Sequence, residues 1–157
     1  MIRRARAADL GTVGRLGALL VRTHHEFDAK RFIAATPKTE EGYGYFLGTQ
    51  LEEPGIIVLV AERNAAVIGY TYAGVEGRDY MALRGPAGVI YDIVVDPPHR
   101  GHGVGRMLLD STIAELESRG VHQIVLSTAE RNEVAQRLFA SAGFRRTMIE
   151  MTRDLQD

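Results

Sequence analysis

The fold is decided by Asp96-Pro97-Pro98-His99-Arg100-Gly101-His102-Gly103-Val104-Gly105-Arg106. The apolar run before this stretch, residues 89–95, is short, rich in β-branched side chains and bounded by prolines, which predicts a buried strand. The segment after it places apolar side chains on one side at helical spacing and predicts a helix that ends at Gly120. A strand, a glycine-rich turn and a helix in this order form a backbone suited to hold an anion.

Three glycines at alternate positions, Gly101, Gly103 and Gly105, allow the turn to curl so that its N–H groups converge. The N-terminus of the following helix adds partial positive charge. Arg100 adds a full charge in a fork that matches phosphate oxygens. The stretch therefore predicts a phosphate-binding turn.

The spacing of this turn excludes two common phosphate-binding motifs. A P-loop requires Gly-Lys-Ser/Thr, which is absent from the sequence, and the dinucleotide fingerprint requires glycine where Arg106 stands. What remains is Arg-x-x-Gly-x-Gly, residues 100–105. Placed between Asp-Ile-Val-Val-Asp-Pro and an amphipathic helix, it resembles the pyrophosphate-binding signature of the GNAT superfamily, the acyl-CoA-dependent N-acyltransferases.

A second motif strengthens this resemblance. The pattern Asn132-x-x-Ala135-x-x-Leu138-Phe139-x-x-x-Gly143-Phe144 is similar to the GNAT helix–turn motif that packs beside the pantetheine arm. The two motifs lie about 30 residues apart, so their joint occurrence by chance is much less probable than that of one motif alone. The resemblance covers residues 56–155 well and the first 50 residues only by the order of elements, and it assigns no subfamily.

Length and composition indicate one domain over residues 1–157. The formal net charge of −1 gives no reason to expect nucleic acid or a membrane as partner. No apolar run is long enough to span a bilayer and no signal peptide is evident, so a cytoplasmic location is expected. Cysteine is absent, and adjacent His24 and His25 point about 100° apart on a helix, so no metal site is expected.

Periodicity predicts an α/β fold with six or seven strands in a mixed sheet and about four helices. Strands are expected at 2–6, 55–62, 67–73, 89–95 and 123–128, with one or two more between Phe144 and Leu155. Helices are expected from Asp9 to near Arg22, from 104 to 119 and from Asn132 to Gly143, with short helical pieces between 23 and 54. The resemblance implies that the sheet splays between the strand ending near Val95 and the strand ending near Ser127.

The resemblance also implies the cofactor site. Acetyl-CoA would enter the gap between the two splayed strands, its pantetheine bonded to main-chain groups like an added strand and its pyrophosphate bound by the turn. A backbone N–H near Val94 or Val95 would polarise the thioester carbonyl. The residues expected to contact the cofactor are Ile93, Val94, Val95, Arg100, Gly101, His102, Gly103, Val104, Gly105, Arg106 and Asn132.

The sequence offers several candidates for the catalytic acid and base. Many family members carry a tyrosine acid where this sequence has Phe139, so water or another tyrosine would substitute, with Tyr91, Tyr72 and Tyr45 as candidates. Asp92 alternates with apolar residues and points into an apolar face that raises its pKa, which makes it the candidate base. A purely structural buried carboxylate is the alternative for Asp92, and Glu62 is interpreted as a strand-end charge.

The leading hypothesis is an N-acetyltransferase that transfers an acetyl group from acetyl-CoA to a primary amine by direct attack in a ternary complex. The acceptor is a small amine, an amino acid derivative, an antibiotic or a peptide terminus. The alternatives are a CoA-binding sensor without turnover, which Phe139 favours, and a nucleotide-binding domain. An edge strand or the final strand near 148–155 offers a surface for a homodimer, as the resemblance suggests.

Overall fold

The computed structural model describes residues 1–155, which contain one five-stranded sheet in the order β1-β2-β3-β4-β5. All neighbouring strands are antiparallel except β4 and β5, which are parallel. The strands are β1 (Ile2–Arg4), β2 (Ile56–Arg63), β3 (Ala66–Glu76), β4 (Ala87–Val95) and β5 (Ile124–Leu126). The α-helices are α1 (Leu10–Phe27), α2 (Thr39–Gln50), α3 (Val104–Ser118) and α4 (Glu133–Ser141). Among the described residues no helix is both long and apolar enough to cross a bilayer.

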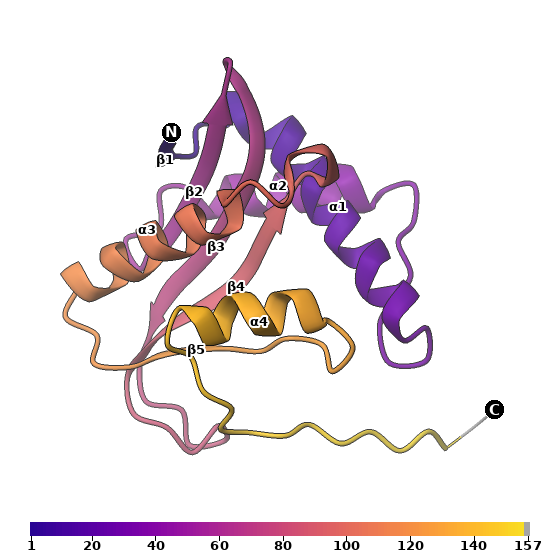
Figure 1. The fold of residues 1–157 in the computed structure, drawn as a ribbon, viewed down its shortest axis with the longest axis vertical. Coiled ribbons are helices and arrows are strands. Elements are labelled where there is room, and N and C mark those ends of the chain that lie inside the picture. The colour runs from indigo at the N-terminus through magenta and orange to yellow at the C-terminus, as the bar shows by residue number, and fades with distance from the viewer. Residues whose placement is uncertain (156–157) are drawn as a thin grey trace.

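The helices cover both faces of the sheet (Figure 1). On one face, α1 and α2 contribute to a buried cluster that contains Val13, Leu16, Leu47, Val60, Tyr70 and Val94. On the other face, α3 and α4 contribute to a second cluster that contains Ile57, Leu59, Ala73, Ile90, Leu109, Leu116 and Phe139. Side chains of β4 enter both clusters, so β4 is the central strand of the molecule.

The predicted α/β fold with four helices and a mixed sheet is confirmed, but the expected six or seven strands are wrong, because the sheet has five. The missing strands were expected between Phe144 and Leu155, where the described chain is extended but pairs with no neighbour. A strand exists only where another strand satisfies its N–H and C=O groups, and alternation of side chains along the sequence carries no information on such a partner.

The segment 23–54 also differs from the prediction of short helical pieces. The first helix continues to Phe27, and α2 is one helix of 12 residues. This helix packs closely on α1 through glycines rather than through a wide apolar stripe. A Cβ on Gly14 would lie 2.5 Å from the carbonyl oxygen of Glu40, and one on Gly17 would lie 2.1 Å from the ring of Tyr43. Glycines on α1 therefore let the Tyr43 side chain pass over α1 toward the sheet.

We expect Gly17→Ala to lower the free energy of unfolding by roughly 1–3 kcal/mol, because the added methyl group overlaps the Tyr43 ring. Gly11→Ala is the matched control, since a Cβ at Gly11 meets nothing within 4 Å on the same helix. The control should raise stability by up to about 1 kcal/mol through helix propensity. Urea unfolding of both variants measures the difference, and equal effects at the two positions would contradict the close packing of α1 on α2.

Candidate active site

The site begins where β4 and β5 stop pairing. Their parallel register runs only from Gly88 opposite Ile124 to Ile90 opposite Leu126. At the next residue, Tyr91, the pairing of β4 with β3 shifts register, so that β4 carries one extra residue there. Such a bulge bends the strand and increases its twist. From Tyr91 onward β4 therefore continues beside β3 alone, and a gap opens between β4 and the segment after β5.

The bulge also decides which way two side chains point. Ile90 and Ile93 pack on the side of α3 and α4. Tyr91 stacks near Tyr72 with 4.7 Å between ring centroids, on the side of α1 and α2. Asp92 faces that same side, as its hydrogen bonds to Tyr43 and Tyr70 show. In a regular strand neighbouring side chains alternate, so the bulge is what places Tyr91 and Asp92 together.

Asp92 is buried, and one of its two carboxylate oxygens is fully engaged. Oδ2 accepts a hydrogen bond from the hydroxyl of Tyr43 at 2.8 Å and from the hydroxyl of Tyr70 at 2.9 Å. Oδ1 bonds to no described residue, yet no described side-chain oxygen or nitrogen is both fully buried and without a partner. Oδ1 is therefore in contact with solvent, and Asp92 lines the cleft described below.

Burial raises the pKa of Asp92 above its ordinary value, while the hydrogen bonds from Tyr43 and Tyr70 act in the opposite direction. The pKa of each of these two tyrosines is raised, first by burial and then by the nearby Asp92 charge. Both tyrosines therefore remain protonated and act as hydrogen-bond donors. The arrangement holds a carboxylate whose proton affinity is increased and whose free oxygen keeps one orientation.

A cleft of about 90 Å³ lies between the end of β4 and the chain after β5. It is lined by Leu20, His24, Ile90, Tyr91, Asp92, Ile93, Leu126, Ser127, Thr128, Asn132, Ala135 and Phe139. The ring of His24 is oriented by a 2.8 Å hydrogen bond between its Nδ1 and the carbonyl of Leu20. Asp92 thus lines the cleft with its carboxylate, and Ser127 and Thr128 line it with hydroxyl side chains.

Main-chain groups of β4 also face this gap. The carbonyl of Asp92 and the N–H of Asp96 both bond to β3, at 3.0 and 2.8 Å. Because successive residues of a strand present their polar groups to opposite sides, Val94 also faces β3, while Ile93 and Val95 face the gap. Of the two oxyanion donors expected, the N–H of Val94 therefore lies on the side of β3, whereas the N–H groups of Val95 and Ile93 lie on the side of the gap.

The predicted anion turn has the required backbone. Gly101 and Gly103 have φ values of +77° and +81°, in the region that favours glycine, and Gly103 immediately precedes α3. None of the N–H groups of residues 101–106 finds an acceptor among the described residues. Arg100 donates from Nε to the carbonyl of Val95 at 2.8 Å, which fixes the guanidinium between the turn and the gap. Arg106 bonds to Asp110 at 2.9 Å and to Ser141 at 3.2 Å, which ties α3 to α4.

The structure brings two further predicted residues to the cleft. Asn132 caps α4 by accepting a hydrogen bond from the N–H of Ala135 at 3.1 Å, so its Oδ1 is committed while its amide nitrogen is left for other contacts. Phe139 is 6% exposed and packs with Phe144, so it contributes only apolar surface to the cleft.

Of the three tyrosines expected as candidate acids, only Tyr91 lines the cleft. Tyr91 lines the cleft, but its hydroxyl donates to Glu76, and burial and this hydrogen bond raise its pKa. Tyr72 donates to Gln50, and Tyr45 projects from α2 into solvent. The role of Tyr91 as acid stays a prediction that its bonded hydroxyl disfavours. Glu62 is bound by Arg3 and does not line the cleft.

Sequence reasoning missed the tyrosines that hold Asp92. Tyr43 lies in the segment where the sequence predicts only short helical pieces, and Tyr70 lies in the expected strand 67–73 without an assigned role. Tyr70 and Tyr72 alternate on β3, so a common face with Asp92 was available as a signal. The approach of Tyr43 depends on the contact between α1 and α2, which has no local signature in the sequence.

The fold and the site define an α/β protein with a glycine-rich turn of free N–H groups beside a split between parallel strands. The sequence profile of the Acetyltransferase (GNAT) family matches residues 20–144. The chain therefore belongs to this family, and the resemblance inferred from the two motifs is confirmed.

Two curated relatives support the assignment. The chain is 38% identical over 96 residues to a mycothiol acetyltransferase of Thermobispora bispora, a match that covers 59% of this chain and 31% of that protein. It is 36% identical over 90 residues to the L-amino acid N-acyltransferase MnaT of Escherichia coli, covering 57% of this chain and 51% of that protein. The matched part thus spans about half or less of the length of these relatives.

Solved structures share the fold. A predicted acetyltransferase from Clostridium acetobutylicum, crystallised with acetyl-CoA, superposes with a TM-score of 0.71 at 19% identity. The superposition covers 99% of this chain and 96% of that one. At this level of identity the likeness establishes the fold alone.

The raised pKa of Asp92 leads us to expect that the stability of the protein depends on pH in a specific way. A pKa raised in the folded state means that the folded protein binds the Asp92 proton more tightly than the unfolded chain does. The resulting stabilisation is complete below the unfolded pKa and is lost as the pH rises through the raised folded pKa. Asp92→Asn lacks this stabilisation. The difference in the free energy of unfolding between Asp92→Asn and the wild type should therefore shift in favour of the variant as the pH rises through this window.

Urea unfolding at a series of pH values measures this difference. Asp154→Asn, at an exposed position, is the control for the loss of one carboxylate and should give a curve parallel to the wild type. A difference between Asp92→Asn and wild type that stays constant or falls with rising pH would contradict a raised pKa.

Proposed function

We propose that this chain is an N-acetyltransferase domain over residues 1–157 that transfers an acetyl group from acetyl-CoA to a primary amine. The observation that carries the proposal is the gap between β4 and β5, which has the anion turn at one side and the free Oδ1 of Asp92 in its wall. Family membership and the acetyl-CoA complex of a structural neighbour support the choice of cosubstrate.

The main-chain groups fit coenzyme A in two places. The free N–H groups of residues 101–106, the N-terminus of α3 and Arg100 suit a pyrophosphate. The polar groups of Ile93 and the N–H of Val95 face the gap and suit the amides of a pantetheine arm. The carbonyl of Val95 already accepts from Arg100, which links the two parts of the site.

Acetyl-CoA supplies the activated acyl group, and the residues of this chain handle the protons and the developing charge. Asp92 Oδ1 accepts a proton from the acceptor ammonium, and the neutral amine then attacks the thioester carbonyl carbon. An N–H of Ile93 or Val95 stabilises the oxyanion that forms. The C–S bond breaks as the amide forms, CoA leaves as a thiolate, and the second proton lost by the amine nitrogen passes to solvent water. Because the thiolate has a pKa near 8–9, it departs without the acid that Phe139 cannot provide.

The acceptor is expected to enter beside the C-terminal end of α1, where Leu20 and His24 line the cleft. The names of the relatives point to compounds of the mycothiol type and to L-amino acids as acceptor classes. Another relative, from Salmonella typhimurium, is named an L-methionine sulfoximine/L-methionine sulfone acetyltransferase. These three classes set the composition of a first amine panel.

The experiment that tests the proposal measures release of free thiol from acetyl-CoA with such a panel. Since the protein contains no cysteine, it contributes no thiol of its own, and for an acceptor that carries a thiol the signal is measured against a blank without enzyme. With a responding amine, Asp92→Asn should lower kcat by about 10²- to 10⁴-fold, the usual contribution of a general base, with unchanged affinity for CoA. Asp154→Asn is the control and should retain full activity. A folded Asp92→Asn variant with normal kcat would remove Asp92 from the mechanism.

Binding of CoA should depend on the backbone of the anion turn. Gly103 has φ +81° with open space around its Cβ position, so alanine there is strained by conformation rather than by contact. We expect Gly103→Ala to weaken CoA binding about 10-fold, the equivalent of roughly 1.4 kcal/mol. Gly85→Ala also enters open space but at a φ outside the glycine region, and should leave affinity unchanged. Calorimetric titration with CoA compares the two, and equal affinities would contradict the site.

A CoA-binding sensor is the second candidate, and the apolar Phe139 at the position of the family acid is the observation that favours it. In that case CoA would bind with the same dependence on Gly103, and no amine of the panel would release thiol. The two candidates are thus separated by turnover and not by binding.

A further inference from the structure

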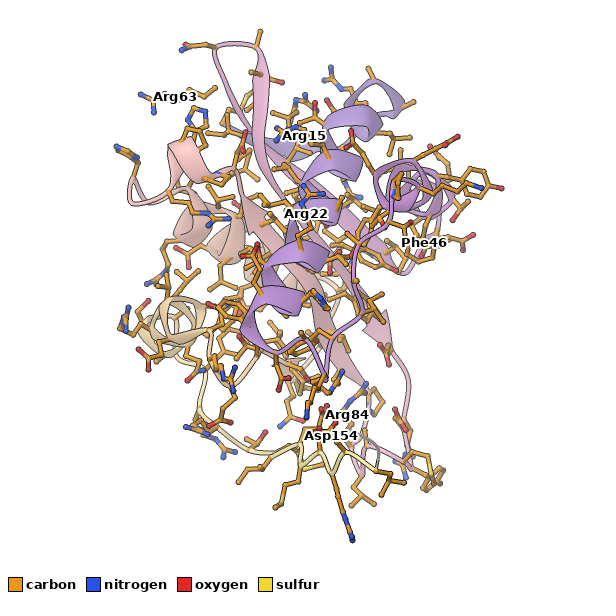
Figure 2. The ribbon with its side chains drawn as sticks, turned by 90° about the vertical axis from the view of Figure 1, so that its right-hand side faces the viewer. Arg15, Arg22, Phe46, Arg63, Arg84 and Asp154 are labelled. Carbon is orange, nitrogen blue, oxygen red and sulfur yellow. The ribbon has the colours of Figure 1, made fainter. Side chains whose placement is uncertain are left out.

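Three aromatic rings from three different elements meet on the side of the sheet that α1 and α2 cover. Phe46 belongs to α2, Tyr72 to β3 and Tyr91 to β4. The rings of Tyr72 and Tyr91 lie 4.7 Å apart between centroids, and Phe46 meets Tyr72 edge to face at 6.0 Å. Figure 2 shows Phe46 on α2 at the right of the view, with Arg84 below it in the loop 77–86. We call the three rings the aromatic platform.

The platform is open to solvent although its two tyrosines are held in place. Phe46 and Tyr91 are 48% and 39% exposed, and Tyr72 is half-buried. The hydroxyl of Tyr72 donates to Oε1 of Gln50 at 3.1 Å. The hydroxyl of Tyr91 donates to Oε2 of Glu76. The polar end of each tyrosine is thus engaged within the chain, which leaves ring surface for a ligand, and apolar surface gathered in this way marks an interaction site.

The platform is continuous with the cleft through Tyr91. This residue lines the cleft, and the bulge in β4 places its side chain on the same side of the sheet as that of Asp92. Oδ1 of Asp92 is the carboxylate oxygen that bonds to no described residue. An ammonium group held by Oδ1 therefore has the Tyr91 ring as a neighbour, and a short substituent on its nitrogen reaches the platform.

The chemistry of the platform favours an aromatic substituent over a cationic or polar one. Aromatic rings attract each other in offset and edge-to-face arrangements at centroid distances of about 4.5–7 Å, and partly exposed rings can accept a further ring in this way. A second cation is less suited, because Glu76 is already paired with Nη2 of Arg84 at 2.8 Å. A polar substituent would meet tyrosine hydroxyls that are already engaged.

We propose that the aromatic platform binds the side group of the acceptor, and that the acceptor is an amine with an aromatic ring a short distance from its nitrogen. The proposal rests on the proposed function for the use of the cleft as the acceptor site. Asp92 holds the amine, Tyr91 and Tyr72 contact the ring of the acceptor, and Phe46 bounds its outer end. The three platform residues thus determine specificity and take no part in proton transfer.

The first test measures binding without turnover, on the protein saturated with CoA instead of acetyl-CoA. Ligand-observed NMR, which detects weak binding, compares 2-phenylethylamine with ethylamine and L-phenylalanine with L-alanine. The members of each pair differ only by the ring. We expect the ring to tighten binding about 10-fold, the equivalent of roughly 1.4 kcal/mol, in at least one pair. Equal affinities within both pairs, or no binding of either aromatic amine, would overturn the proposal.

The second test removes rings from the platform. Tyr91→Leu deletes a ring, whereas Tyr91→Phe keeps the ring and deletes only the hydroxyl. The preference for the aromatic member of a pair should fall about 5-fold in Tyr91→Leu and be retained in Tyr91→Phe, because the ring and not the hydroxyl makes the contact. Loss of the preference in both variants, or in neither, would contradict the platform.

A second pair of variants tests the outer end of the platform on α2. Phe46→Ala should lower the preference for the aromatic amine about 2- to 5-fold, since one ring of the platform is lost. Tyr45→Ala is the matched control, because Tyr45 is the neighbouring residue, is 77% exposed and lies outside the cleft. Equal effects of the two variants would argue against a specific contact at Phe46 and would overturn its place in the platform.

The readouts separate this proposal from the proposed function. Thiol release with small amines, without any preference for a ring, overturns the platform and leaves the acetyltransferase standing. A preference for the ring in binding, without thiol release from any amine, contradicts the acetyltransferase and supports the platform as a ligand site. The two proposals therefore fail on different measurements.

Discussion

The structure depends on one break in main-chain pairing. Parallel strands β4 and β5 bond over three residue pairs, and at Tyr91 the bulge turns β4 away. Had the pairing continued, the polar groups of Ile93 and Val95 would be consumed by β5 and no gap would exist. The bulge costs ladder hydrogen bonds, and in return it leaves a short length of strand whose N–H and C=O groups are fixed in direction and available to a ligand.

The same bulge creates the electrostatic character of the site. By placing Asp92 on the side of α1 and α2, it buries a carboxylate among aromatic side chains. The burial would be costly without partners, and the hydroxyls of Tyr43 and Tyr70 supply them at a single oxygen. The approach of Tyr43 depends in turn on Gly17, because any side chain there would occupy the space of the ring. Stability of the charge and orientation of its free oxygen thus come from the same contacts.

The features that the sequence predicts well are those that local backbone geometry determines. The turn at 101–105 requires positive φ values that glycine permits, and Asn132 is a good N-cap whatever the rest of the fold does. Features that depend on distant contacts were missed or wrong. The helix α2 contains three glycines that weaken its signal but allow close packing, and the expected final strands lack a partner in the sheet. Asp92 was identified from alternation, although alternation is broken at the preceding residue.

The chemistry at the two ends of the proposed reaction is unequal, and the structure explains why this asymmetry is tolerable. Deprotonation of an ammonium acceptor is demanding near neutral pH, and here a buried carboxylate with a raised pKa is held in place by two donors. Departure of the CoA thiolate is easier, since a conjugate thiol with a pKa of about 8–9 makes it a tolerable leaving group. Phe139 in place of a tyrosine therefore removes assistance from the step that needs it least, and its ring joins the core with Phe144. A site with a well-supported base and no positioned acid is consistent with a slow step at proton removal or amine attack rather than at thiolate departure.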